Sequence, residues 1–212
     1  MSGTSWDHNA WYHRTLLGQL PPGSRRVLDV GCGAGALARE LATRVPQVDA
    51  LDADQAMVAL ARRSAPANLD VLHADVLAAE LPAGSYDAVL SSSVLHHLPL
   101  SPALTTMAGW LRPGGVLAAV TLPRVDLPRD LPVEAAAVLG HHGLGAVFAA
   151  GRRLTGRPLF DHEPMGSDMP MRDPELTTRQ VRAAAAAVLP GVRVRRLLFW
   201  RFVLTWTKPF TG

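Results

Sequence analysis

The sequence predicts an α/β protein whose mostly parallel sheet carries helices on both faces. Short apolar runs alternate with helix-like segments through the first two-thirds of the 212 residues, a pattern typical of βαβ units. A glycine-rich turn at residues 31–35 follows the first buried strand. The last two apolar runs follow one another almost directly, which indicates a tight antiparallel pair. We therefore expect one sheet of seven strands.

The first two-thirds of the chain contain an N-terminal helix and five strands. The helix is expected from Asp7 to Leu20, because Pro21-Pro22-Gly23 ends it. The core that follows consists, in chain order, of a strand at 26–30, a helix at 37–44, a strand at 48–51, a helix at 55–64, strands at 69–73 and 86–91, a helix at 102–111 and a strand at 116–121.

The alternation breaks between Leu122 and Asp173, where prolines and glycines are frequent. We expect an insertion there with two short helices, at 133–139 and 146–154, that forms a lid over the site. A helix at 175–189 and strands at 192–199 and 202–207 complete the fold, with Arg201 at the junction of the two strands. The expected single domain has four parts: an arm at 1–22, a core at 23–121, the insertion at 122–173 and the C-terminal helix and strand pair at 174–212.

Composition narrows the classes of protein and partner. Hydrophobic residues make up 48% and charged residues 18%, no uninterrupted run of about 18 apolar residues would cross a bilayer, and the N-terminus does not resemble a secretory signal. Cys32 is the only cysteine, so no intramolecular disulfide or multi-cysteine zinc site is expected. We expect a cytoplasmic monomer or homodimer that binds no membrane, no metal and, despite a pI of about 9.7, no nucleic acid, because the pI reflects arginines rather than a basic patch.

The segment VLDVGCGAG, residues 27–35, contains the feature most directly tied to ligand binding. A buried strand leads into Gly31, Gly33 and Gly35, so the backbone can turn tightly and approach a ligand without Cβ atoms in the way. Cys32 lies between two of these glycines; no nearby base is identifiable, and we interpret it as structural.

These glycines alone allow two cofactors. Gly31, Gly33 and Ala36 also fit the pattern for a nicotinamide dinucleotide. Asp29, two residues before the first glycine, would add negative charge beside a pyrophosphate but suits the sulfonium and α-amino cations of S-adenosylmethionine.

An acidic residue followed by alternating glycines resembles the first motif of class I S-adenosylmethionine-dependent methyltransferases. The resemblance covers roughly residues 25–121 and the closing strand pair, and it is similar to the broad small-molecule type that includes quinone-biosynthesis and natural-product enzymes. It implies a Rossmann-like fold, S-adenosylmethionine as cofactor and S-adenosylhomocysteine as product. Asp52 would accept both ribose hydroxyls, with Ala53 and Met57 beside the adenine, whereas Asp54 reads as a helix N-cap.

The later motifs of the resemblance follow in order. Asp75 would accept the adenine amine and Val76 would offer its backbone amide, although Asp75 could instead cap its own loop. The segment YDAVLSSSVLHHLP places Ser91 and Ser92 beside the methionine part of the cofactor.

Transfer of a methyl group to a small-molecule acceptor mainly requires orientation of a nucleophile and exclusion of water. If the acceptor is a hydroxyl, an imidazole could take its proton. His96, more than its neighbour His97, is the candidate for a contact with acceptor or cofactor.

The N-terminal arm supplies three further candidates. Related enzymes cover the cofactor with such an arm, so Tyr12 could bind the cofactor carboxylate, and His8 or His13 could serve the acceptor. The alternative is an amphipathic helix that docks Trp6 and Trp11 on the core.

Two rival functions remain at this point. One is an NAD(P)-dependent oxidoreductase, weakened because Lys208 is the only lysine, which removes the Tyr and Lys pair of the short-chain type. The other is a binding protein or non-methylating enzyme that uses S-adenosylmethionine as a scaffold.

Overall fold

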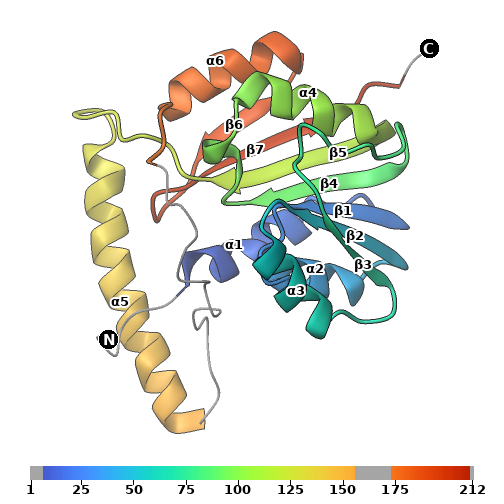
Figure 1. Ribbon diagram of the computed structural model, residues 1–212. Helices are drawn as coiled ribbons and strands as arrows, with labels where there is room; N and C mark the ends of the chain where they lie inside the picture. The colour runs from blue at the N-terminus through green and yellow to red at the C-terminus, as the bar shows by residue number, and fades with distance from the viewer. Residues whose placement is uncertain (1–6, 156–172, 211–212) are drawn as a thin grey trace.

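A computed structural model describes residues 7–155 and 173–210 and contains one seven-stranded sheet (Figure 1). The strand order is β3-β2-β1-β4-β5-β7-β6, with the first five strands parallel and β7 antiparallel to β5 and β6. The strands are β1 Arg26–Val30, β2 Gln47–Asp52, β3 Leu69–His73, β4 Tyr86–Ser92, β5 Leu111–Thr121, β6 Arg193–Arg196 and β7 Phe202–Thr207. The predicted fold class is confirmed, with the bounds of β1, β3 and β7 as the sequence predicted.

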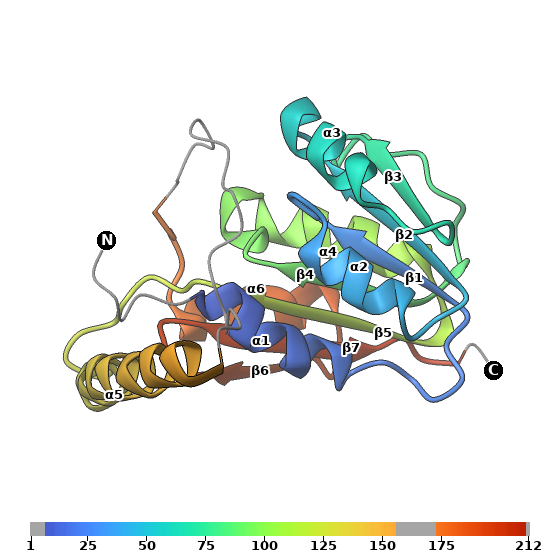
Figure 2. The same cartoon turned by 90° about the horizontal axis from the view of Figure 1, so that it is seen from below.

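Helices cover both faces of this sheet (Figures 1 and 2). They are α1 His8–Leu17, α2 Ala36–Ala42, α3 Gln55–Arg63, α4 Leu100–Trp110, α5 Leu131–Thr155, α6 Thr178–Val188 and the 3-10 turn η1 Leu95–His97. Two separate apolar clusters result because successive strand residues point to opposite faces: Val27 packs with α1, α2 and α3, whereas Leu28 packs with α4 and α6. Both faces of β1 are therefore buried, as expected of a central parallel strand.

Side-chain caps fix where several helices begin. Asp7 accepts the Asn9 backbone amide at the start of α1, and Asp54 accepts the Ala56 and Met57 amides at the start of α3. Thr177 and Gln180 form a capping box at the start of α6. Each cap satisfies amides that lack a partner within the helix, and the N-cap interpretation of Asp54 is confirmed.

The insertion differs from the sequence prediction, because α5 is one helix of 25 residues instead of two short ones. Its inward face packs Leu144 and Phe148 with the core cluster of α1, and tertiary packing of this kind outweighs the low helix propensity of glycine. A Cβ at Gly140 would lie 3.1 Å from the Phe199 ring, so this glycine lets the helix approach closely. The predicted lid residues 156–172 and Trp6 lie outside the described residues.

The outward face of α5 is apolar, with Leu139 and Val147 exposed. Within the described parts of the chain, α5 is the one helix that by length and composition could cross a membrane.

Strand β6 ends three residues earlier than the predicted 192–199, because a tight bend replaces its last part. Phe199 and Trp200 both adopt positive φ, 52° and 59°, and the Leu197 amide donates to the Arg201 carbonyl across the bend. The bend buries the Phe199 side chain and carries the chain back into β7.

Candidate active site

The carboxyl ends of β1, β2 and β4 open onto a cavity of about 700 Å³. Parallel sheets of this kind bind ligands at these strand ends. Helix α1 contributes Asp7, Asn9, Ala10 and His13 to its wall. The remaining lining residues come from the glycine turn (Asp29 to Ala34, Ala36, Leu37), from the end of β2 and the start of α3 (Leu51 to Asp54, Met57), from the loop after β3 (Ala74 to Val76) and from the segment after β4 (Ser92 to Val94, His97, Leu98).

Two glycines of the turn serve different purposes. The amides of Gly31 and Cys32 donate to the Leu51 carbonyl over 2.8 and 3.0 Å, which fixes the turn on β2. A Cβ at Gly31 would lie 2.1 Å from the Val94 side chain, whereas a Cβ at Gly33 would meet nothing within 4 Å. Gly31 is therefore required by packing, and Gly33 keeps a space open to the cavity.

Gly35 does not line the cavity, in contrast to its expected role in cofactor binding. It is buried with a φ of 89° as the N-cap of α2, and a Cβ there would approach Ala61 to 3.1 Å. Its role is the close packing of α2 on α3.

Asp29 is a buried carboxylate without a hydrogen-bond partner. It lines the cavity, is 1% exposed, and neither oxygen accepts a hydrogen bond of normal geometry. Burial raises its pKa to about 7; the His13 imidazole and the Ala38 amide oppose the shift, and Asp52 reinforces it. A cation placed in the cavity would supply the missing partner.

Asp52 lies next to the same space and also holds the turn. Its two oxygens accept the backbone amides of Gly33, over 2.8 Å, and of Asp54, over 2.9 Å. Each oxygen retains a further lone pair for a ligand. The sequence did not reveal that Asp52 orders the glycine turn itself.

The expected adenine residues line one side of the cavity. Met57 and Val76 are buried there, and Ala53 and Asp75 are exposed beside them. One Asp75 oxygen accepts the Leu77 amide over 2.7 Å, so Asp75 does cap its own loop, which was the alternative to adenine binding. The second carboxylate oxygen is left for a ligand.

Only one of the two predicted serines reaches the cavity. The Ser91 hydroxyl is buried and donates to the Val30 carbonyl over 3.0 Å, so the structure does not bring this expected cofactor residue to the cavity. Ser92 lines the cavity, and its buried hydroxyl has no hydrogen-bond partner. Ser93, which we did not predict, also lines the cavity and donates to Asn9 Oδ1 over 2.7 Å.

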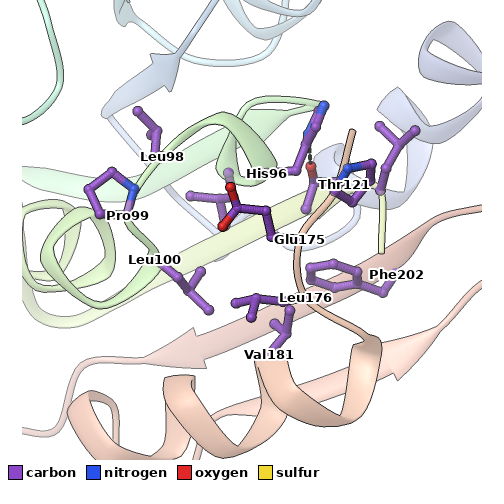
Figure 3. A pocket seen from close by; sticks show the side chains of 12 residues that line it. His96, Leu98, Pro99, Leu100, Thr121, Glu175, Leu176, Val181 and Phe202 are labelled. Carbon is purple, nitrogen blue, oxygen red and sulfur yellow. Dashed lines mark hydrogen bonds between the residues drawn. The ribbon is translucent and has the colours of Figure 1, made fainter. Parts of the chain in front are cut away.

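The adjacent histidines face different spaces. His97 lines the large cavity, whereas His96 lines a separate cavity of about 130 Å³ with Thr121, Glu175 and Phe202 (Figure 3). His96 Nδ1 lies 2.7 Å from the Thr121 hydroxyl, and burial, then the charges of His97 and Arg201, lower its pKa to about 4. The structure therefore places His97, and not the expected His96, at the large cavity, because Thr121, 25 residues away, holds the His96 ring.

The N-terminal arm also contributes residues other than those expected. The Tyr12 hydroxyl donates to the Leu198 carbonyl over 2.5 Å, and burial raises its pKa to about 12. His8 stacks on Phe199 and lies 3.1 Å from a His141 ring nitrogen. Neither side chain lines the cavity, so the expected roles of Tyr12 and His8 are not supported, because both pack against the β6–β7 bend.

His13 is the histidine of the arm that reaches the cavity. It is 6% exposed, and its Nδ1 lies 3.3 Å from a Glu40 oxygen. Asn9, on the same face of α1, also lines the cavity and was not predicted. Its place one helical turn before His13 is the sequence feature that could have indicated it.

Cys32 lines the cavity as a buried thiol. Its Sγ donates to the Gly33 carbonyl over 3.6 Å, and burial raises its pKa above the ordinary value. A raised thiol pKa disfavours the nucleophilic thiolate, in agreement with the structural interpretation. Across residues 7–155 and 173–210, no group of three His, Cys, Asp or Glu side chains could hold a metal ion.

Comparisons with known proteins agree with this geometry. A family model described as a methyltransferase domain matches residues 27–115. An uncharacterized methyltransferase of Mycobacterium bovis is 36% identical over 207 residues, which is 96% of this chain and 98% of that protein. A ubiquinone biosynthesis O-methyltransferase of Xanthomonas axonopodis is 38% identical over 124 residues, which is 56% of this chain and 52% of that protein.

Solved structures give the same result for the fold. An S-adenosylmethionine-bound amino pentose methyltransferase of Micromonospora echinaspora matches with a TM-score of 0.61 over 96% of this chain and 92% of that one, at 21% identity. Together these similarities decide between the two cofactors that the glycines alone allowed, in favour of S-adenosylmethionine.

Proposed function

The chain belongs to the class I S-adenosylmethionine-dependent methyltransferases, and on that premise we propose that it methylates a small-molecule acceptor bound beside the cofactor cavity. The observation that carries the proposal is Asp29, a buried carboxylate without a hydrogen-bond partner in a cavity large enough for a nucleoside and a small acceptor. The names of the quinone and amino pentose methyltransferases among the similar proteins support an acceptor of this size.

The residues of the cavity suit the parts of S-adenosylmethionine. Asp29 would pair with its cationic end, Asp52 would accept the ribose hydroxyls, and Met57 and Val76 would contact the adenine. Gly33 leaves room for the ligand beside the turn. The bound cofactor supplies a methyl group that its sulfonium activates toward a nucleophile.

The protein's own contribution is orientation, exclusion of water and, for a hydroxyl acceptor, removal of a proton. Helix α1 covers the cavity with Asn9 and Ala10, which limits access of water. Of the imidazoles, His13 and His97 line the cavity. We assign the proton acceptor to His97, because it follows β4 closely, whereas His13 lies beside Glu40.

The wider expectations stay part of the proposal. We propose that the protein is cytoplasmic and forms one domain, and that the insertion at 122–173 shapes the acceptor pocket. Helix α5, in the described part of the insertion, lies next to α1 (Figure 2), which supports this role of the insertion. The pathway would be of the quinone or secondary-metabolite kind, on the strength of similar proteins alone.

A methylation assay tests the proposal. Purified protein, S-adenosylmethionine and separate sets of phenols, carboxylic acids and amines are incubated, and products heavier by one CH₂ are sought by mass spectrometry. We expect a methylated small molecule with the wild type and a rate at least tenfold lower with His97→Gln if the acceptor is a hydroxyl. Methyl transfer to protein or nucleic acid but to no small molecule would refute the proposal.

A further inference from the structure

Arg201 is a buried arginine at the start of β7. The residue is 9% exposed, so most of its side chain is removed from water. One Nη donates to Asn9 Oδ1 over 2.9 Å, the other makes a long contact of 3.4 Å with the Trp200 carbonyl, and Nε has no partner. Of the five N–H groups of an arginine, most are therefore left without an acceptor.

No carboxylate neutralises this charge among the described residues. The comparable arginines in the structure are paired: Arg26 lies 2.6 Å from Asp49, and Arg196 lies 2.7 Å from Glu134. Arg201 has no such ion pair; Asp7 favours its charged form only through space. Burial lowers its pKa to about 10, so it remains protonated at neutral pH. A buried charge without a partner is costly, and an anionic ligand would remove that cost.

Asn9 connects Arg201 to the cofactor cavity. Asn9 lines the cavity, and its Oδ1 accepts from both Arg201 and the Ser93 hydroxyl. Because its oxygen is taken by two donors, the amide nitrogen of Asn9 is the group left to donate to a ligand. Asn9 and Ser93 line the cavity, and Arg201 lies directly behind Asn9 without lining the cavity itself. We call these three residues the donor cluster.

We propose that the donor cluster is a binding subsite for a carboxylate or similar anion on the methyl acceptor. The inference rests on the proposed function and adds the chemical class of the acceptor: a small molecule with one anionic group, which accepts a hydrogen bond from the Asn9 amide and is attracted by the positive charge of Arg201 behind it. A charge removed from water acts more strongly on a nearby ion than an exposed charge does.

The methionine part of the cofactor also carries a carboxylate. The position of β7 in the sheet argues against this carboxylate as the anion near Arg201. The cofactor's ammonium and carboxylate share one carbon atom, so a carboxylate beside an ammonium at Asp29 must also lie near β1. Strand β7 is three places from β1 in the sheet, so the backbones of the two strands are about 14 Å apart at the usual spacing of strands.

Calorimetric titration of the complex with S-adenosylhomocysteine tests the inference without turnover. The probes are benzoate, 4-hydroxybenzoate and 3-phenylpropionate, each compared with its uncharged amide. We expect at least one carboxylate to bind the wild-type complex tenfold or more tightly than its amide. We expect Arg201→Met to remove that preference and Arg195→Met, the same change at an exposed residue of β6, to retain it.

Three results would overturn the inference. The first is no preference for any carboxylate over its amide in the wild type. The second is a preference that persists in Arg201→Met. The third is a tenfold loss of S-adenosylhomocysteine affinity in Arg201→Met without a loss for 5′-methylthioadenosine, which lacks the amino-acid part, because this would assign Arg201 to the cofactor.

Further variants keep the test decisive. If Arg201→Met does not fold, Arg201→Gln removes the charge but can still donate to Asn9, and loss of the carboxylate preference is expected; an unchanged preference would contradict the inference. If the carboxylate preference is found but no small molecule is methylated, the proposed function fails while the anion subsite stands.

Discussion

Two buried charges of opposite sign lie in the cavity and next to it. At the Asp29 end, formed by β1 and β2, the Asp29 carboxylate lines the cavity and accepts no hydrogen bond of normal geometry; at the Arg201 end, behind Asn9 and near β7, the guanidinium has no ion pair among the described residues. Both groups are at least nine-tenths buried. Our proposals give each charge a ligand group of the opposite sign, a cation beside Asp29 and an anion near Arg201.

The two ends also differ in how ligand binding relates to the fold. The Asp29 end is made from consecutive motif residues held by backbone hydrogen bonds, such as those from Gly31 and Cys32 to Leu51. The Arg201 end joins α1 to the β6–β7 bend, which lie 192 residues apart between Asn9 and Arg201. The first end is therefore encoded locally, and the second exists only after the C-terminal strands pair.

The largest effect is expected in the stability of the ligand-free protein as a function of pH. The folded-state pKa of Asp29 is about 7, above its ordinary value of 3.8, so the folded protein holds this proton more tightly than the unfolded chain. As pH rises from 4 to 7, the wild type should lose up to about 4 kcal/mol of unfolding free energy relative to Asp29→Asn. Denaturant titrations at pH 4, 5.5, 7 and 8 measure the free energy of unfolding of both proteins. If the two free energies changed with pH in parallel, Asp29 would not be an uncompensated charge.

Substitutions in the glycine turn should distinguish a residue needed for stability from a residue needed for ligand binding. Gly31→Ala places a Cβ 2.1 Å from Val94 at a φ of 71° and should cost about 3 kcal/mol of stability. Gly33→Ala has a φ of 52° but open space, so it should cost about 1 kcal/mol and reduce cofactor affinity instead. Melting curves and titration with S-adenosylhomocysteine distinguish the two; equal loss of stability would contradict this division.

Asp52 tests the ribose end of the same site. Asp52→Ala should weaken S-adenosylhomocysteine binding by about 2 kcal/mol, because it loses two hydrogen bonds to the ribose and loosens Gly33. Asp70→Ala, at an exposed position on β3, is the matched control and should leave the affinity unchanged. Unchanged affinity in Asp52→Ala would remove Asp52 from the site.

The smallest effect concerns Tyr12, at the Arg201 end. Tyr12→Phe should cost about 1 kcal/mol of stability through loss of the hydrogen bond to Leu198. Affinity for S-adenosylhomocysteine should not change, since Tyr12 does not line the cavity. A tenfold loss of affinity would restore Tyr12 as a ligand of the cofactor.

The sequence predicted those parts of the molecule that depend on local patterns. Buried runs and turns gave β1, β3 and β7 with their observed bounds, and the residues Asp29, Gly33 and Asp52 line the cavity as expected. These features follow from periodicity and from residues a few positions apart.

The parts that could not be predicted depend on contacts between distant segments. Tyr12 is held by Leu198, 186 residues away, and His96 by Thr121; the choice between adjacent histidines is made by such partners and not by spacing. Helix α5 likewise stays continuous through its glycines because Phe148 packs on the core. Tertiary contacts of this kind override local propensity.

Proton release on cofactor binding tests the central claim most directly, namely that Asp29 is the buried counter-charge of the cofactor. Calorimetric titration with S-adenosylhomocysteine at pH 6, in two buffers of different ionisation enthalpy, gives the number of protons exchanged. Because the pKa of Asp29 is about 7 in the free protein and a bound cation lowers it, the wild type should release close to one proton and Asp29→Asn none. Binding of S-adenosylhomocysteine without proton release by the wild type, or with equal release by Asp29→Asn, would contradict the account.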